Sequence, residues 1–229
     1  SVAFDSSVSI FNDGIYCGRS SCLEAGFLDV GTVEVARGPQ GALFGKSTIA
    51  GAITVNSARP TDTFEAYATA AAELEDGGYR LGGAVSGPVS DTFRLRLAGS
   101  YRDLDGGVEN IATGQDDNSI EDWAARLSAE WDLGPNTLLF AKLGGASNEI
   151  LGRSNQLVGA GALAGPGFPG NPANIETNPN QIRNVSTGVP VPEFDERDQF
   201  AISGQLTTMF GDHEVQIMAG HWETESERY

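Results

Sequence analysis

A glycine-rich segment in the first quarter of the chain has the composition of a phosphate-binding loop. It reads Gly41-Ala42-Leu43-Phe44-Gly45-Lys46-Ser47. A P-loop places four residues between its two glycines, so that successive backbone amides converge on a phosphate, whereas this segment has three. We therefore expect a glycine-rich turn with an exposed lysine. A later pair, Gly159 and Gly161, lacks the third glycine of a dinucleotide-binding motif and follows no apolar strand.

The two cysteines, Cys17 and Cys22, are separated by four residues in a stretch typical of a loop. This spacing is compatible with a small-loop disulfide, with half of a zinc site, or with two free thiols. The only histidines, His213 and His221, lie far away in the sequence, so a full set of zinc ligands is not evident. The residues alone leave these alternatives open.

Acidic residues are concentrated between Asp103 and Asp122. The run Asp103-Leu104-Asp105-Gly106-Gly107 begins like a calcium loop, but glycine stands where the third oxygen ligand is needed. We therefore predict a solvated acidic loop. The sequence shows no Ser/His/Asp set, no paired carboxylates for acid–base chemistry and no other metal-ligand spacing. It predicts a protein that is not an enzyme and that has no cofactor and no metal.

The stretch from Val33 to Val55 predicts two strands joined by glycine-rich turns. Its defining positions are Val33, Glu34, Val35, Arg37, Gly38, Pro39, Gly41, Gly45 and Gly51. Valine at every second position indicates a half-buried strand. The Arg-Gly-Pro sequence ends that strand, because proline lacks a backbone donor and glycine accepts backbone angles that other residues do not. Residues 52–55 then begin a second, apolar strand.

This order of residues resembles the signature of the plug domain of TonB-dependent outer-membrane receptors. In that family, a strand ending in Val-Glu-Val is followed by Arg-Gly-Pro, an aromatic-glycine pair and a glycine-rich return into an apolar strand. The match runs through most of Leu28 to Pro60. The segment from Val8 to Tyr16 reads as two short strands around an Asn-Asp-Gly turn and is similar to another part of the same plug.

The chain of 229 residues is strongly acidic, with 14 Lys+Arg against 31 Asp+Glu and a net charge of −17. This charge argues against a nucleic-acid partner, whose phosphates it would repel. No apolar run reaches the roughly 18 residues of a membrane helix, but barrel strands do not show such runs. The first residues lack the basic start and apolar centre of a signal peptide. Since the resembled family is exported, we expect a fragment of a longer protein.

After Pro60, apolar residues occupy alternate positions along about seven runs of roughly ten residues, the length that crosses a bilayer at a tilt. The runs are residues 64–74, 79–86, 93–102, 122–133, 137–147, 199–210 and 215–219. The opposite face holds most of the charges, including three arginines of the third run, which would face a wet lumen at little cost. The fifth run is less regular, because Leu138 and Phe140 share a face with Lys142.

The connections between these runs differ in length. Three connections are tight turns: Val89-Ser90-Asp91, Gly134-Pro135-Asn136 and Gly211-Asp212. The connections that alternate with them are long at residues 104–119 and 150–196, and only the first of these outer loops is short. Short turns at one rim and long loops at the other are typical of outer-membrane barrels. Aromatic residues near the two rims suit aromatic girdles; they are Phe93, Trp131, Phe210, Tyr101 and Trp123. The longest loop suits an external binding loop, with simple disorder as the alternative.

The predicted fold class is mainly β, with a small α+β plug portion followed by antiparallel transmembrane β-barrel strands that form an incomplete barrel. We assign residues 1–60 to the C-terminal part of the plug with its linker, and residues 61–229 to the N-terminal part of the barrel. A soluble or secreted β-sandwich binding module is the alternative, because its strands would alternate in the same way. A passive porin is a third interpretation, against which the plug argues.

The resemblance implies energised uptake of a scarce nutrient across a Gram-negative outer membrane, most commonly a ferric siderophore. The implied partners are outer-membrane lipid, the small extracellular ligand and a TonB-type energising protein, whose contact box we expect to precede Ser1. The ligand itself is not named by the sequence, because cobalamin and glycans use the same design. Export would place Cys17 and Cys22 in an oxidising compartment and favours their pairing.

Within the plug motif, Arg37 is the candidate for a lock between plug and barrel. Plug arginines of this region in the resembled family contact carboxylates on the inner barrel wall. Three glutamates stand at alternate strand positions that are expected to face the lumen, namely Glu65, Glu73 and Glu130. Alternatively, Arg37 pairs with a carboxylate beyond Tyr229 or binds local backbone carbonyls. If Arg37 forms this lock, Arg37→Ala in the full-length receptor would raise the leak of bulky antibiotics and impair energised uptake.

Overall fold

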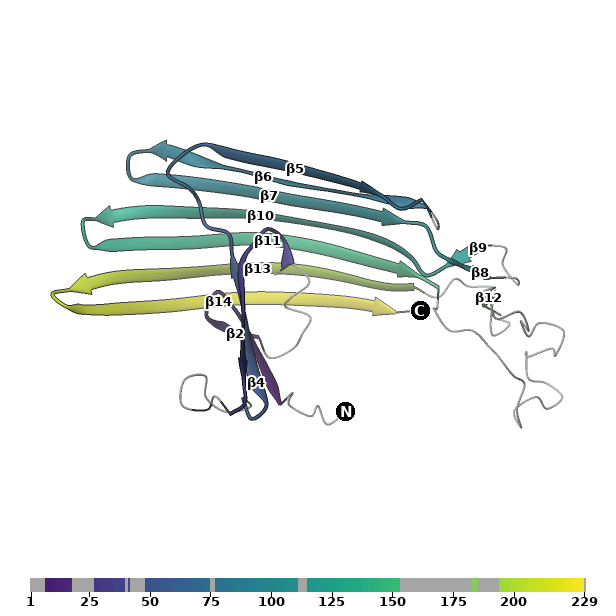
Figure 1. Cartoon of the computed structure of the whole chain (residues 1–229), viewed down its shortest axis with the longest axis horizontal. Coiled ribbons are helices and arrows are strands. Elements are labelled where there is room, and N and C mark those ends of the chain that lie inside the picture. The colour runs from purple at the N-terminus through teal and green to yellow at the C-terminus, as the bar shows by residue number, and fades with distance from the viewer. Residues whose placement is uncertain are drawn as a thin grey trace.

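The structure is a computed structural model that describes residues 7–17, 27–39, 41, 48–74, 77–110, 115–152, 183–184 and 194–228. Strands dominate these residues, which confirms the mainly β fold (Figure 1). The short helical turn expected in the plug portion at residues 24–30 is described only from residue 27 onward, where the chain turns into a strand at Val30. Within the described ranges, no helix is long and apolar enough to span a membrane.

The first four strands form what we call the N-terminal sheet. They are β1 (Val8–Asn12), β2 (Ile15–Cys17), β3 (Val30–Arg37) and β4 (Gly51–Ser57), in the spatial order β2-β1-β4-β3. Strands β1 and β2 make an antiparallel hairpin, β1 runs parallel to β4, and β3 runs antiparallel to β4. The hairpin turn has positive φ at Asp13 and Gly14, which the predicted Asn-Asp-Gly turn accepts readily.

Strand β4 begins at the last glycine of the plug motif for a steric reason. A Cβ atom on Gly51 would lie 2.4 Å from the carbonyl oxygen of Ala36 in the paired strand β3. Its φ of 154° is also one that residues with side chains rarely adopt. Glycine is therefore required where the returning strand joins β3.

Seven longer strands form an antiparallel sheet that we call the wall sheet. They are β5 (Glu65–Ala72), β6 (Gly78–Ser90), β7 (Phe93–Leu104), β10 (Ser119–Gly134), β11 (Thr137–Leu151), β13 (Phe194–Phe210) and β14 (His213–Arg228). Each of these seven strands pairs with the next of the seven along the chain, so the sheet is a continuous meander from β5 to β14. Two-residue turns follow β6, β10 and β13 at one end, as predicted, while the long connections lie at the other end (Figure 1).

A small third sheet belongs to the long connections. It consists of β8 (Val108–Asn110), β9 (Gln115–Asp117) and β12 (Arg183–Asn184), in the order β12-β8-β9. Strand β12 runs parallel to β8, so the two long connections meet at this end of the wall sheet. The rest of the predicted external loop, residues 153–182 and 185–193, lies outside the described residues.

The wall sheet has its apolar face exposed, and the middle of its charged face is covered. Large apolar side chains that remain about half exposed or more include Leu97, Trp131, Ile202 and Ile217. The N-terminal sheet stands against the opposite, inward face (Figure 1), where Arg96, Arg126, Ser128 and Glu130 are buried. This arrangement reverses the usual pattern of a soluble protein, in which apolar residues are buried and charges are exposed.

Candidate functional site

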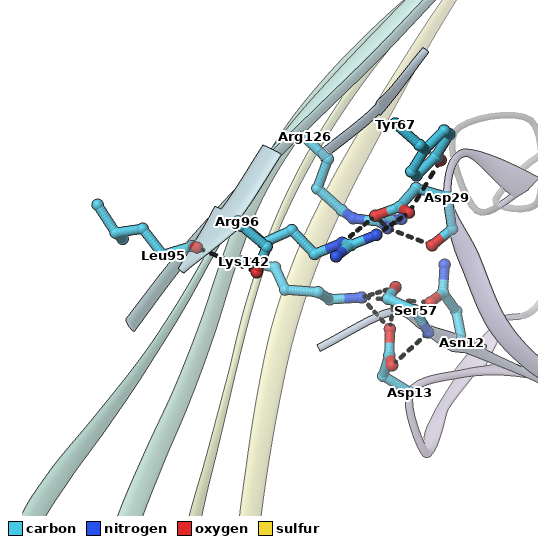
Figure 2. A network of polar contacts seen from close by, with 10 residues as sticks. Asn12, Asp13, Asp29, Ser57, Tyr67, Leu95, Arg96, Arg126 and Lys142 are labelled. Carbon is cyan, nitrogen blue, oxygen red and sulfur yellow. Dashed lines mark hydrogen bonds and ion pairs between the residues drawn. The ribbon is translucent and has the colours of Figure 1, made fainter. Parts of the chain in front are cut away.

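Asp29 is the most heavily contacted side chain between the two sheets. It lies just before β3, has a positive φ of 50°, and its side chain is 3% exposed. The Arg96 guanidinium from β7 donates to both carboxylate oxygens, at 2.7 Å from Nε and 2.6 Å from Nη2. Arg126 Nη2 from β10 donates to the backbone carbonyl at 2.8 Å and to the carboxylate at 3.3 Å. The Tyr67 hydroxyl of β5 donates at 3.0 Å (Figure 2).

These contacts make one carboxylate of the N-terminal sheet the common partner of three wall strands. Burial by itself raises the pKa of the Asp29 carboxyl. The hydrogen bonds and charge of Arg96, helped by Tyr67 and Arg126, outweigh burial and hold that pKa below its ordinary value of 3.8. Asp29 is therefore ionised at neutral pH, as an acceptor of charge-assisted hydrogen bonds must be.

Asp13 makes a second anchor from the turn of the β1–β2 hairpin. Its carboxylate pairs with the Lys142 ammonium of β11 and also accepts from Ser57, at 2.9 Å from the backbone amide and 2.8 Å from the hydroxyl. Lys142 also donates to Asn12 Oδ1 at 3.3 Å (Figure 2). Burial raises the pKa of the Asp13 carboxyl, but the charge and hydrogen bond of Lys142, with the Ser57 bonds, lower it below 3.8.

Arg59, just after β4, forms a third anchor of opposite polarity. Its Nη1 donates to Glu130 Oε1 at 2.8 Å, and its Nη2 donates to Gln205 Oε1 at 3.3 Å. The guanidinium also lies 4.1 Å from the ring centroid of Phe140, a cation–π distance. This contact explains the irregular fifth run, because Phe140 and Lys142 both face the N-terminal part of the chain rather than the outward surface.

The connection that follows Arg59 stays on the wall sheet. The Thr61 amide and hydroxyl bond to the Ser86 hydroxyl of β6, at 2.9 and 2.8 Å. Arg94 of β7 donates to the Asp62 carboxylate at 2.8 Å and also pairs with Asp132 at 3.0 Å. The chain between β4 and β5 is thus bound to the inward face by successive polar contacts.

A cavity of about 510 Å³ opens between Asp29 and the part of the wall sheet nearest the long connections. Arg102, Asn148 and Arg197 line it at the ends of β7, β11 and β13 that join those connections. Its lining holds apolar side chains as well as these polar ones, so the cavity can bind a small molecule through apolar contacts, hydrogen bonds and charge. In the ranges that the structure describes, no group of three or more His, Cys, Asp or Glu side chains could hold a metal ion.

The structure describes only part of the predicted plug motif and cysteine pair. Gly41 is described, whereas Gly45, with most of the P-loop-like segment, and Cys22 lie outside the described residues. Cys17, which ends β2, is disulfide-bonded. The pairing of Cys17 with Cys22 stays a prediction.

The predicted role of Arg37 also stays a prediction. Arg37 ends β3 with an exposed side chain. Of its candidate partners, Glu65 and Glu73 are exposed, and Glu130 is held by Arg59 at 2.8 Å and lies 3.7 Å from Arg94. Glu130 is thus bound by Arg59, which lies in the predicted linker.

Sequence reasoning missed the two anchors that contain carboxylates of the N-terminal sheet. The expected contacts joined arginines of the plug to carboxylates of the wall, whereas in the structure Asp13 and Asp29 bind cations of the wall. One signal was available, because the strand alternation places Arg96, Arg126 and Lys142 on the inward face. A buried cation needs an acidic partner, and that partner could have been sought in the N-terminal region.

Known proteins were compared with the chain, and no family model matches it. In sequence it is 31% identical over 140 residues to the pesticin receptors of Yersinia enterocolitica and Yersinia pestis. This similarity confirms the predicted resemblance to the TonB-dependent outer-membrane receptors. The matched part covers 57% of this chain and 20% of those relatives, so the chain spans about a fifth of their length.

Solved structures of outer-membrane siderophore receptors share the fold. The ferric yersiniabactin uptake receptor FyuA of Yersinia pestis superposes with a TM-score of 0.71 and 18% identity, over 97% of this chain and 32% of that one. The ferric-catecholate import receptor Fiu of Escherichia coli K12 gives 0.69 and 18%, over 99% and 33%. The ferripyoverdine receptor of the Pseudomonas aeruginosa outer membrane gives 0.66 and 20%, over 92% and 27%.

Proposed function

We propose that this chain is part of an outer-membrane receptor that takes up a ferric siderophore, or a comparably scarce nutrient, with energy from a TonB-type inner-membrane protein. The N-terminal sheet would be the C-terminal part of the plug, with its linker ending near residue 60. The wall sheet would be the first part of the barrel, from about residue 61 onward. The plug motif glycines and the Arg-Gly-Pro turn would shape the plug.

The observation on which this proposal rests is the reversed polarity of the wall sheet. A soluble β-sandwich buries an apolar face against a second sheet. Here the apolar face, with Leu97 and Ile202 about half exposed, is uncovered, and the second sheet covers the face that holds Arg96 and Arg126. An outer-membrane barrel needs this distribution, because its outward face meets lipid and its inward face meets water or a polar plug. The sandwich alternative is not favoured.

The placement of the open cavity supports a ligand path from the outside. The cavity lies beside Asp29 and Tyr67 and opens toward the end of the wall sheet where the long connections lie. Long connections lie on the extracellular side of outer-membrane barrels. A ligand that enters there would meet the N-terminal sheet and the wall sheet together. This role requires binding and movement, and we propose no covalent chemistry for it.

The test uses the full-length receptor in a Gram-negative strain that lacks its own siderophore receptors. We expect uptake of radiolabelled iron from at least one ferric siderophore in a panel, and loss of that uptake when the TonB-type protein is deleted. Membrane fractionation should place the receptor in the outer membrane, with heat-modifiable migration on gels. Uptake that persists without the energising protein, or a receptor found in the soluble fraction, would contradict the proposal.

A further inference from the structure

Three cations of the wall sheet have acidic partners that come from the N-terminal sheet. They are Arg96 of β7, Arg126 of β10 and Lys142 of β11, and their side chains are 10%, 6% and 11% exposed. Arg96 and Lys142 lie in one cross-strand row, because each pairs with Ser128 of β10. Arg126 precedes Ser128 by two residues on the same face. The three cations therefore form one compact group, which we call the wall cation cluster (Figure 2).

Two carboxylates neutralise this cluster incompletely. Asp29 is shared by Arg96 and Arg126, and Asp13 binds Lys142. The Nε of Arg126 is buried and has no hydrogen-bond partner among the described residues. Glu65 of β5 is an electrostatic neighbour of Arg96, but its side chain is exposed. The cluster has one more positive charge than its two buried partners supply.

Other wall arginines differ from the cluster, because their partners include acids of the wall itself. Arg94 pairs with Asp132 of β10, and Arg102 pairs with Asp122 of β10. These pairs stay together wherever the N-terminal sheet lies. The wall cation cluster instead loses both of its buried carboxylates when that sheet moves.

We propose that the wall cation cluster is a latent oxyanion-binding site, which Asp13 and Asp29 occupy in this structure and which oxyanion groups of the ligand occupy when the N-terminal sheet is displaced. The ligand part of this inference rests on the proposed transport function. Paired guanidinium groups bind carboxylate or phosphate oxygens through two parallel hydrogen bonds. Displacing the two carboxylates leaves three positive charges close together without their acidic partners, and such a group attracts another anion.

While the N-terminal sheet lies against the wall sheet, such an anion is kept from the wall cation cluster. A partly open pocket that Arg126 and Lys142 both line measures about 60 Å³, and the carboxylates of Asp29 and Asp13 already accept from these two cations. An oxyanion can bind the donors that Asp13 and Asp29 now occupy only after these carboxylates leave. Binding of an oxyanion and seating of the N-terminal sheet therefore compete.

Inorganic phosphate is the probe, and the full-length receptor in detergent is the sample. We expect calorimetric titration to show phosphate binding to the Asp13→Asn/Asp29→Asn variant and none to the wild type. Adding Arg126→Gln should weaken that binding about tenfold or more, the value of one charged hydrogen bond. Asp62→Asn is the matched control, because its partner Arg94 keeps a wall carboxylate, and it should bind no phosphate.

A second measurement needs no variant with altered plug charges. Phosphate should speed proteolysis of the wild-type N-terminal sheet relative to chloride at equal ionic strength, because it binds the displaced state. The same comparison in Arg126→Gln corrects for general salt effects and should show a smaller difference. No phosphate effect in the wild type, or binding to the double variant that survives Arg126→Gln, would overturn the latent site.

These outcomes are independent of transport. Phosphate binding and proteolysis report on the cluster in the purified receptor, whereas iron uptake in cells reports on the proposed function. Uptake without a phosphate effect would leave the transport proposal standing and remove the oxyanion site. A phosphate effect without uptake of any siderophore would leave the oxyanion site standing and remove the transport proposal.

Discussion

At the scale of single residues, two aspartates join the N-terminal sheet to the wall sheet. Asp13 and Asp29 each accept several hydrogen bonds, and their side chains are 8% and 3% exposed. Such groups stabilise an interface only while both charges are present, because removing one partner leaves the other charge buried and unpaired. The attachment of the two sheets therefore depends strongly on a few side chains.

Asp29→Asn should loosen the N-terminal sheet in the full-length receptor. The change leaves Arg96 and Arg126 without a buried counter-charge, and breaking such a pair costs about 3 to 5 kcal/mol. Proteolysis of the N-terminal sheet under mild denaturant should become faster. Asp62→Asn is the control: the Asp62 side chain is 83% exposed, and an exposed pair contributes about 0 to 1 kcal/mol. Equal proteolysis of the two variants would show that the Asp29 anchor does not hold the sheet.

Acid should weaken the same attachment. The pKa values of Asp13 and Asp29 are lower in the folded protein than the ordinary 3.8, so the unfolded state binds protons first as the pH falls. Their stabilisation is fully present above the ordinary pKa and is lost as the pH falls through the lowered values. The melting temperature of the wild-type receptor should fall below pH 4 or so. Asp13→Asn/Asp29→Asn should show a smaller fall, and parallel pH curves would contradict the assignment.

At the scale of elements, the strand pair β3–β4 shapes the N-terminal sheet through its glycines. Gly51 lies against the backbone of Ala36, whereas a Cβ on Gly41 would meet no atom of the described residues within 4 Å. The plug motif thus contains glycines with different physical reasons. One is required by close packing of two strands, and the other lies in open space.

Gly51→Ala should destabilise the N-terminal sheet, whereas Gly41→Ala should not. The new methyl group would clash with a carbonyl oxygen that belongs to the strand backbone, and overpacking of this kind costs about 1 to 3 kcal/mol. Hydrogen exchange of the β3 and β4 amides in the full-length receptor measures the effect. Unchanged protection in Gly51→Ala would mean that the strand pair can shift at no cost.

At the scale of the whole molecule, the wall sheet presents an apolar surface on one side and binds a second sheet on the other. Leu97, Leu127 and Val85 are neighbours across β7, β10 and β6, and all are more than 40% exposed. Edge strands β5 and β14 leave the sheet open within the described residues. Spanning sheets must close because hydrocarbon offers no hydrogen bonds, and FyuA extends well beyond the 32% that this chain matches.

Leu97→Arg should impair assembly of the full-length receptor in the outer membrane. Leu97 lies in the middle of β7, where an outward-facing arginine costs about 2 to 4 kcal/mol. Val89→Arg is the matched control, because Val89 is exposed near the end of β6 beside a tight turn, where the cost falls to about 0 to 1 kcal/mol. The yield of heat-modifiable receptor in the outer-membrane fraction measures both, and equal yields would contradict a lipid-facing surface.

The sequence by itself determined the strands, their order and their two faces. The signals are short-range: alternation with period two, tight Gly-Pro-Asn and Gly-Asp turns, and the Arg-Gly-Pro motif. Such signals depend on neighbouring residues in the sequence and not on tertiary contacts. They predicted the seven wall strands and the side on which Arg96 lies. They also predicted the hairpin of which Asp13 forms part.

Only the tertiary structure decided which charges meet. Asp29 and Arg96 are 67 residues apart, and Asp13 and Lys142 are 129 residues apart. Their contact depends on how the N-terminal sheet is placed against the wall sheet, and strand periodicity contains no information about that placement. Several acidic and basic residues are expected on the same inward face, so the sequence does not distinguish which of them pair. The docked sheets select among them, because a buried charge is stable only beside an opposite charge that reaches it.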